Sequence, residues 1–175
     1  SKKQDDAREL KADPVAAATA PDLDYQPPLP AQQPGPIALV GCGGIARNHL
    51  DAYRQKKYPV TLLCDINLTA ARELRDEFFP DAEITDDWES VFTRNDIVTV
   101  DLATHPDHRL PQIRMALENG KHVLSQKPFV TDLAEGRKLV DLADANELKL
   151  AVNQNGRWAP YFSYLRQVLK RRLLG

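Results

Sequence analysis

Cysteine is scarce in this sequence of 175 residues, which contains only Cys42 and Cys64. The two lie 22 residues apart, without a Cys-x-x-Cys pair and without histidines at zinc-ligand spacing. Neither a disulfide framework nor a zinc site is therefore indicated, and we predict no metal site. Unpaired cysteines are typical of proteins in a reducing compartment, which favours a cytoplasmic location.

Long apolar runs and a surplus of one charge are also missing. No apolar stretch approaches the ~20 residues that a membrane span needs, and the charged residues 1–11 lack the apolar core of a secretory signal. Lys and Arg number 23 against 25 Asp and Glu, so no basic surplus points to nucleic acid or to an anionic membrane. With 42% hydrophobic and 27% charged residues, the composition indicates one or two soluble globular domains.

Proline is unevenly distributed, because seven of the 13 prolines lie in the first 36 residues. This stretch mixes Ala, Gln and Asp without periodicity and should lack a core of its own. We predict that residues 1–36 form a proline-rich arm or linker in which Leu23 and Tyr25 contact a surface. A ligand for a proline-recognition module at Pro27–Pro30 is the alternative. Residues 37–175 then form the globular domain.

From Ile37 onward, short β-rich runs alternate with helical patterns, which indicates parallel strands joined by crossover helices. Apolar runs such as IALV and IVTVDLA are continuous, as in strands that are buried on both faces. We predict an α/β fold, a doubly wound parallel sheet with helices on both faces. The predicted strands are Ile37–Val40, Val60–Asp65, Glu83–Thr85, Ile97–Ala103, His122–Ser125 and Leu148–Val152.

Helix ends are marked by capping residues and prolines. Asn67 is predicted to cap a helix over Leu68–Phe79. Pro106 suits the first turn of a helix, Thr131 or Asp132 caps the next one, and a last helix covers 160–173.

Three of the eight glycines cluster directly after the first predicted strand. They form the sequence GCGGIA, a G-x-G-x-x-A pattern that opens a helix. The first glycine allows a tight turn, the second lets the backbone approach a pyrophosphate, and the small alanine lets the helix pack closely while its N–H groups face the anion. A strand-to-helix turn without a ligand is the alternative. The candidate cofactor contacts here are Gly41, Gly43, Gly44, Ile45 and Ala46.

An acidic residue, Asp65, ends the second predicted strand, 24 residues after Gly41. This is close to the ~20-residue interval at which a carboxylate binds the adenosine ribose. Such a carboxylate accepts hydrogen bonds from the ribose hydroxyls and repels a 2′-phosphate, and no Lys or Arg follows before Arg72. The pattern favours NAD over NADP, with Ile66 as a neighbouring contact. A capping or turn role for Asp65 is the alternative.

Taken with three later motifs, the glycine loop resembles the N-terminal half of the Gfo/Idh/MocA family of dehydrogenases, which includes glucose-fructose oxidoreductase and inositol dehydrogenase. The later motifs are DLATHPDH (101–108), GKHVLSQKP (120–128) and NQNGRWAP (153–160). The resemblance covers 37–175 and implies a Rossmann-type fold, NAD as cofactor, a sugar or cyclitol substrate and a homo-oligomer. It also implies a second domain, absent from this chain, that supplies the substrate pocket and the principal acid and base.

The resemblance implies roles for residues at two strand ends. Thr104 takes the position of a cofactor contact, and His105 and His108 are further candidates, with ordinary loop or helix-end roles as the alternative. The family's Glu-Lys-Pro motif reads Gln126, Lys127 and Pro128 here, so these three are implied to lie at the cofactor. Lys127 is the implied catalytic residue, which orients or polarises the substrate hydroxyl, although glutamine lacks the charge that holds a neighbouring cation protonated.

After the last predicted strand, residues 153–158 resemble the family's segment that leads to an arginine-bearing turn. Arg157 can present a planar cation and Trp158 an apolar wall to the nicotinamide or substrate, with a structural role for either residue as the alternative. The chain is thus predicted to be the cofactor domain of an NAD-dependent oxidoreductase that moves a hydride between nicotinamide and a secondary alcohol of a sugar or cyclitol. A non-catalytic dinucleotide-binding scaffold or sensor is the alternative. A flavodoxin-like domain leaves the GKHVLSQKP motif unexplained.

Overall fold

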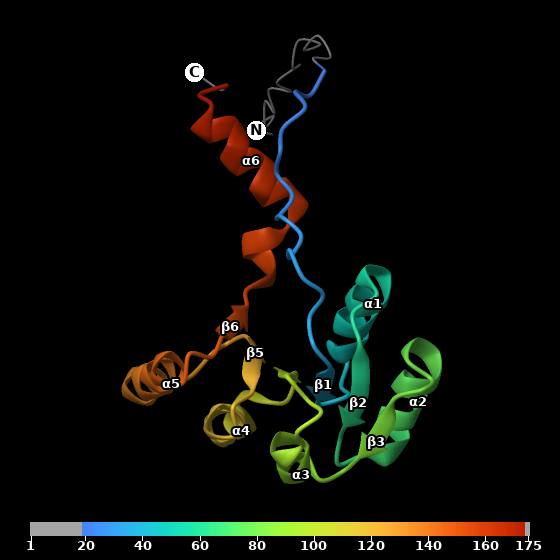
Figure 1. The fold of residues 1–175 in the computed structure, drawn as a ribbon. Helices are drawn as coiled ribbons and strands as arrows, with labels where there is room; N and C mark the ends of the chain where they lie inside the picture. The colour runs from blue at the N-terminus through green and yellow to red at the C-terminus, as the bar shows by residue number, and fades with distance from the viewer. Residues whose placement is uncertain (1–18, 174–175) are drawn as a thin grey trace, which may run out of the picture.

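Residues 19–173 are described by a computed structural model and form a six-stranded parallel sheet between layers of helices (Figure 1). The strands are β1 (Ile37–Val40), β2 (Val60–Cys64), β3 (Glu83–Thr85), β4 (Thr99–Leu102), β5 (His122–Gln126) and β6 (Leu150–Asn153). Their order across the sheet is β3-β2-β1-β4-β5-β6, and all neighbouring pairs are parallel. The strand order reverses between β1 and β4, which is where open α/β sheets bind ligands at the carboxyl ends of the strands.

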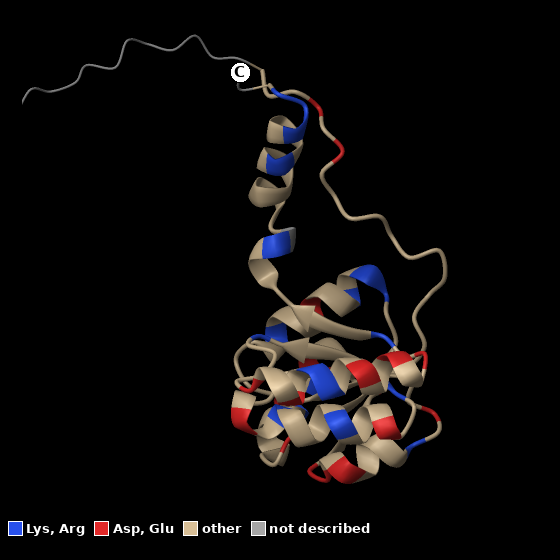
Figure 2. Cartoon of the chain, turned by 90° about the vertical axis from the view of Figure 1, so that its left-hand side faces the viewer, with Lys and Arg blue, Asp and Glu red and all other residues tan. Residues whose placement is uncertain are grey.

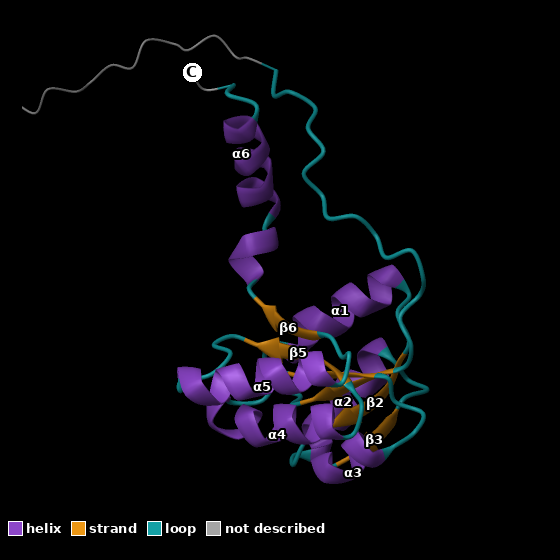
Figure 3. Ribbon diagram, turned by 60° about the vertical axis from the view of Figure 1, so that its left-hand side comes forward, coloured by secondary structure: helices purple, strands orange, loops and turns teal. Residues whose placement is uncertain are grey.

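Helices cover both faces of this sheet (Figure 3), so the predicted doubly wound α/β fold is confirmed. One face is covered by α1 (Ala46–Lys56) and α2 (Leu68–Phe78). The other is covered by α3 (Trp88–Thr93), α4 (Pro106–Glu118) and α5 (Leu133–Ala145). The short 3-10 helix η1 (Asn155–Trp158) and α6 (Pro160–Lys170) follow β6 and stand away from the sheet (Figure 1).

Two apolar cores hold these layers together, because successive strand residues face opposite sides of the sheet. Leu39 of β1 packs with Leu50 of α1 and Leu74 of α2. Its neighbour Val40 points the other way and belongs to the core that includes Ile113 of α4. Each fully buried aliphatic side chain contributes about 1.5–3 kcal/mol of burial free energy, which explains why the strands read as continuous apolar runs.

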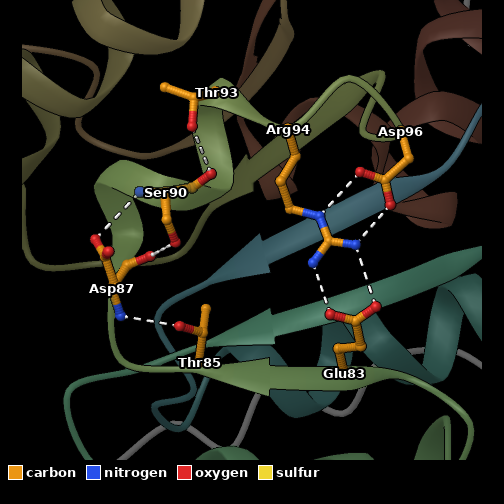
Figure 4. A network of polar contacts seen from close by, with 7 residues as sticks. All are labelled: Glu83, Thr85, Asp87, Ser90, Thr93, Arg94 and Asp96. Carbon is orange, nitrogen blue, oxygen red and sulfur yellow. Dashed lines mark hydrogen bonds and ion pairs between the residues drawn. The ribbon is translucent and has the colours of Figure 1, made fainter.

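The short helix α3, which the sequence patterns did not predict, is held at both ends by polar contacts (Figure 4). Asp87 caps it, since its Oδ1 accepts hydrogen bonds from two N–H groups of the first turn, both at 3.1 Å. Just after the helix, the Arg94 guanidinium forms ion pairs with Glu83 and Asp96, each at 2.6 Å. These contacts connect β3 to the segment that leads into β4.

Eight predicted element ends were wrong by one to three residues; they belong to β2, β4, β5, β6, α2 and α6. β2 stops before Asp65, which lies just beyond the strand, and β4 begins at Thr99 because the N–H groups of Val98 and Thr99 both donate to the Pro36 carbonyl before the regular register starts. Edge strand β6 begins at Leu150, because the preceding residues form the turn from α5. The last helix ends at Lys170, after which the chain turns with Arg172 at a positive φ of 54°.

The first part of the arm that is described contacts α6, and the arm then runs down to β1 (Figure 1). The Tyr164 hydroxyl of α6 donates to the Pro21 carbonyl at 2.8 Å, and the Tyr25 ring contacts the Tyr164 ring edge-on at 5.7 Å. Leu23 is buried. Both residues expected to contact a surface therefore do so, whereas residues 1–18 of the predicted arm lie outside the described residues.

Charged side chains of both signs are dispersed over the outer helices (Figure 2). No helix within residues 19–173 combines the length and apolarity needed to cross a bilayer.

Candidate functional site

A cleft of about 530 Å³ opens at the carboxyl ends of β1, β2 and β4, at the reversal of strand order. Small-molecule sites typically occupy roughly 300–1,000 Å³. The predicted residues that line the cleft are Gly41, Gly43, Asp65, Ile66, Thr104, His105 and His108. Its other lining residues, which were not singled out from the sequence, include Asp86, Trp88, Pro111 and Gln112.

Two glycines of the loop after β1 meet different requirements. Gly41 has a φ of 97°, and a Cβ there would lie 2.8 Å from the backbone of Ala103 and of Thr104. The protein itself therefore needs glycine at this position. At Gly43 a Cβ would meet no atom within 4 Å, so the bare backbone at Gly43 leaves open space into which a ligand can come close.

The N-terminus of α1 follows this loop and is open to an anion. Ile45 precedes the helix without a side-chain hydrogen bond to it, and its first turn contains no acidic residue. Gly44 is exposed, whereas Ala46 is fully buried against the sheet. The positive end of the helix dipole favours an anionic ligand at such a terminus, although the Ala46 and Asn48 N–H groups already donate to the carbonyls of Gly43 and Ile45. In contrast, α2, α3 and α5 are capped by Asn67, Asp87 and Asp132.

Asp65 connects the glycine loop to the end of β2. Its Oδ2 accepts a hydrogen bond from the Cys42 N–H at 2.6 Å, and its Oδ1 accepts one from the Asn67 N–H at 2.8 Å. Asp65 therefore does stabilise the turn, which was the alternative to a ligand contact. Each of its carboxylate oxygens still has a second lone pair for another donor. The half-buried Asp65 also lines the cleft, so its carboxylate is fixed there and can accept a further hydrogen bond. Ile66 beside it is 88% exposed.

The thiols of Cys42 and Cys64 are free and buried beside Asp65. Burial raises the pKa of each thiol to about 12, and the charge of Asp65 adds to the effect. Both thiols are therefore protonated at neutral pH and contribute no charge to the cleft.

The opposite wall of the cleft is formed by the turn after β4. The Thr104 hydroxyl donates to Oε1 of Gln112 at 2.6 Å. The rings of His105 and His108 are exposed and lie 6.5 Å apart, and Nδ1 of His105 is 3.3 Å from the Asp107 carboxylate. Within residues 19–173 no group of three or more His, Cys, Asp or Glu side chains is arranged to hold a metal ion.

The other predicted residues do not line this cleft but lie at the ends of β5 and β6. Lys127 and Pro128 are exposed directly after β5. Arg157 is exposed in η1, and the Trp158 side chain lies outside the described residues. The structure thus divides the predicted set into a group around β1, β2 and β4 and a second group beyond β5 and β6.

Gln126 belongs to a buried polar network that the sequence reasoning missed. Its Nε2 lies 3.1 Å from Nε2 of His49, which is also 2.9 Å from Nδ2 of Asn153. On the other side of the ring, Nδ1 of His49 lies 2.6 Å from Oδ2 of Asp101, and the Tyr53 hydroxyl donates to the same oxygen at 2.7 Å. Burial and the Asp101 charge raise the pKa of Tyr53 above its ordinary value, so its hydroxyl acts as a donor. The sequence contained one signal of this network, namely the carboxylate of Asp101 inside the otherwise apolar run IVTVDLA.

Known proteins share this sequence and arrangement. The oxidoreductase family with an NAD-binding Rossmann fold, GFO_IDH_MocA, matches residues 36–154. D-apiose dehydrogenase of Paraburkholderia graminis is 30% identical over 140 residues, which cover 79% of this chain and 37% of that enzyme.

Two solved structures extend the comparison. The WlbA dehydrogenase of Chromobacterium violaceum, in complex with NADH and UDP-GlcNAcA, is 28% identical with a TM-score of 0.64, covering 74% of this chain and 38% of that one. The scyllo-inositol dehydrogenase of Lactobacillus casei, with bound NAD(H) and scyllo-inositol, is 22% identical and shares the fold with a TM-score of 0.72, covering 80% and 42%. The chain thus spans about two fifths of these relatives. It belongs to the GFO_IDH_MocA oxidoreductase family and comprises its NAD-binding Rossmann domain.

Proposed function

We propose that this chain binds NAD in preference to NADP and is the cofactor domain of an enzyme that transfers a hydride between nicotinamide and a secondary alcohol of a sugar or cyclitol. The observation that carries the proposal is the cleft in which Gly43, the open N-terminus of α1 and Asp65 meet at the reversal of strand order. The substrate class is supported by relatives named for D-apiose and scyllo-inositol.

The strand order supports a proposed placement of the two halves of the dinucleotide. The pyrophosphate lies at the loop after β1, and Asp65 at the end of β2 binds the adenosine ribose, so the adenosine half lies on the β2 side. The nicotinamide half then extends across β4, past Thr104, toward Lys127 at the end of β5. The nicotinamide supplies the hydride chemistry when bound. Lys127, with an exposed ammonium group, binds and polarises the reacting hydroxyl.

Calorimetry with NAD and NADP on this chain tests the cofactor assignment. We expect NAD to bind at least tenfold more tightly than NADP, because the Asp65 carboxylate repels the 2′-phosphate. Asp65→Asn should reduce this ratio toward one. Asp76→Asn, which removes the same charge from the exposed surface of α2, should leave the ratio unchanged. A chain that binds neither nucleotide, or prefers NADP, contradicts the assignment.

The hydride-transfer assignment is tested in the longest natural reading frame that contains this chain, with sugars and inositols as substrates. Lys127→Ala should reduce kcat at least about a hundredfold, whereas the affinity for NAD should fall by no more than about tenfold, the loss expected when the contact of Lys127 with the nicotinamide half is removed. Lys138→Ala is the matched control, because Lys138 pairs with Glu135 on the outer surface of α5. Tight NAD binding without any hydride transfer supports the scaffold or sensor alternative instead.

A further inference from the structure

The turn that carries Lys127 is held from within the protein by a buried cation. Arg109 of α4 is only 2% exposed. Its Nη1 donates hydrogen bonds to the carbonyls of Gln126 and of Pro128, the latter at 2.6 Å, and its Nη2 donates to the Lys127 carbonyl at 3.2 Å. One guanidinium therefore binds the carbonyls of three successive residues.

Burying the charge of Arg109 costs more free energy than a purely structural contact requires. Within residues 19–173 no carboxylate pairs with Arg109, and its Nε has no hydrogen-bond partner. Burial lowers the pKa of the guanidinium below its ordinary value, as expected for a cation removed from water without a counter-ion. An apolar side chain of similar volume fills a core at lower cost than a buried cation without a counter-ion. What an apolar side chain cannot do is fix three carbonyl groups with a rigid planar fork of donors.

The same turn is held from its other side through Gln126. The Gln126 Oε1 accepts the Lys127 N–H at 2.8 Å, while the Gln126 Nε2 contacts His49. Both peptide groups of Lys127 are therefore fixed, one by Gln126 and one by Arg109, whereas its side chain extends into solvent at the carboxyl edge of the sheet. The direction in which the lysine leaves the backbone is set by these contacts.

We propose that Arg109 is a positioning residue, which orients the turn at 126–128 so that Lys127 meets the nicotinamide half of bound NAD. The assignment rests on the proposed function, because it takes the cofactor to lie across β4 toward β5. Arg109 itself does not line the cleft around β1, β2 and β4. Its substitution therefore acts on the nicotinamide half of the ligand and leaves the adenosine half bound as before.

Affinities for NAD and for AMP separate positioning from general stability. AMP occupies only the adenosine half of the site, next to Asp65. In Arg109→Met we expect NAD affinity to fall about tenfold, equivalent to about 1.4 kcal/mol, and AMP affinity to stay within about twofold. Arg109→Lys keeps the cation but cannot span three carbonyls, so it should show the same selective loss in smaller measure. It also provides the test if the methionine variant does not fold. Arg114→Met, on the same helix and paired with Glu135, should change neither affinity.

Each outcome decides the assignment. Selective loss of NAD affinity supports it. An equal loss for NAD and AMP shows a general structural role and overturns it, as does unchanged affinity for both. If the wild-type chain binds AMP but not NAD, the positioning role is wrong while the adenosine site stands. If the wild-type chain binds neither nucleotide, the proposed function fails and the positioning role with it.

Discussion

The imidazole of His49 on α1 lies 2.6 Å from the fully buried carboxylate of Asp101 on β4, although the two residues are 52 positions apart in the chain. The Tyr53 hydroxyl donates to the same carboxylate oxygen, Oδ2, whereas Oδ1 has no hydrogen-bond partner among the described residues. The pair therefore attaches the helix that follows the glycine loop to the strand on the other side of the cleft.

Removal of His49 should destabilise the fold strongly. His49→Ala leaves the buried Asp101 carboxylate with a single donor, and such a loss typically costs about 3 kcal/mol when the buried acceptor is charged. Tyr53→Phe removes one hydrogen bond and should cost about 1–2 kcal/mol. Denaturant unfolding measures both, with the exposed Asn48→Ala on the same helix as control. Equal, small effects of all three substitutions contradict a stabilising role of the network.

Gln126→Glu should weaken the buried network around His49. In the native protein the Gln126 Oε1 accepts the Lys127 N–H, so the amide Nε2 faces His49 and the ring accepts there while Nδ1–H donates to Asp101. A glutamate would present an acceptor to this accepting nitrogen, so the hydrogen bond is lost and a second carboxylate is buried in the network.

The free energy of unfolding reports this change. We expect Gln126→Glu to lower it by about 1–3 kcal/mol. Gln112→Glu keeps an acceptor for the Thr104 hydroxyl and does not contact His49, so it should cost less. An equal or smaller cost for Gln126→Glu overturns the hydrogen-bond assignment.

Alanine substitution of the two loop glycines should have opposite effects on stability and on NAD binding. Gly41→Ala should lower the free energy of unfolding by about 2 kcal/mol or more, because its φ is positive and the added Cβ meets backbone at 2.8 Å. Gly43→Ala should preserve stability, because its Cβ meets nothing within 4 Å, but should weaken NAD binding at least tenfold. Thermal unfolding and calorimetry distinguish the two. Native NAD affinity in Gly43→Ala would falsify the close approach of a ligand to this backbone.

The Arg94 ion pairs make stability depend on pH. Hydrogen bonds and charge from Arg94 lower the pKa of Glu83 below 4.5 and that of Asp96 below 3.8. Because these pKa values are lower in the folded than in the unfolded chain, the ion pairs stabilise the fold above the ordinary values, and the contribution is lost as pH falls through the lowered ones.

Arg94→Gln should therefore reduce the free energy of unfolding at pH 7 but not in acid. We expect the difference from the native chain to shrink between about pH 5 and about pH 2, and to shrink at high salt because both carboxylates are exposed. Urea unfolding at a series of pH values measures it, with the exposed Arg72→Gln as control. A difference that is constant over this range contradicts the mechanism.

The sheet was largely predictable because strands buried on both faces are continuous apolar runs. The run IALV has the bounds of β1, and the glycines after it mark the loop. Helix α3 was missed because six residues, of which Val91 and Phe92 are buried, are too few to show a helical period. Its cap at Asp87 gives it a defined start, but a single acidic residue is common in turns as well.

The candidate site was predictable where its residues belong to motifs at the ends of strands. The glycine loop and Asp65 belong to a motif with fixed spacing, so their places at one edge followed from the strand pattern. Trp88 and Arg109 acquire their surroundings only when crossover helices bring distant strands together. A buried arginine bound to carbonyls 17–19 residues away leaves no periodic signal in the sequence.

The contact between the arm and α6 has a kinetic consequence. The hydrogen bond from Tyr164 to Pro21 closes a chain segment of 143 residues, the kind of contact whose loop-closure entropy slows its formation. Pro21 and Tyr164 come close in space only after β1 and β6 have joined the sheet. We therefore expect the arm to dock last during folding and to detach first during unfolding, while the nucleotide cleft is still intact.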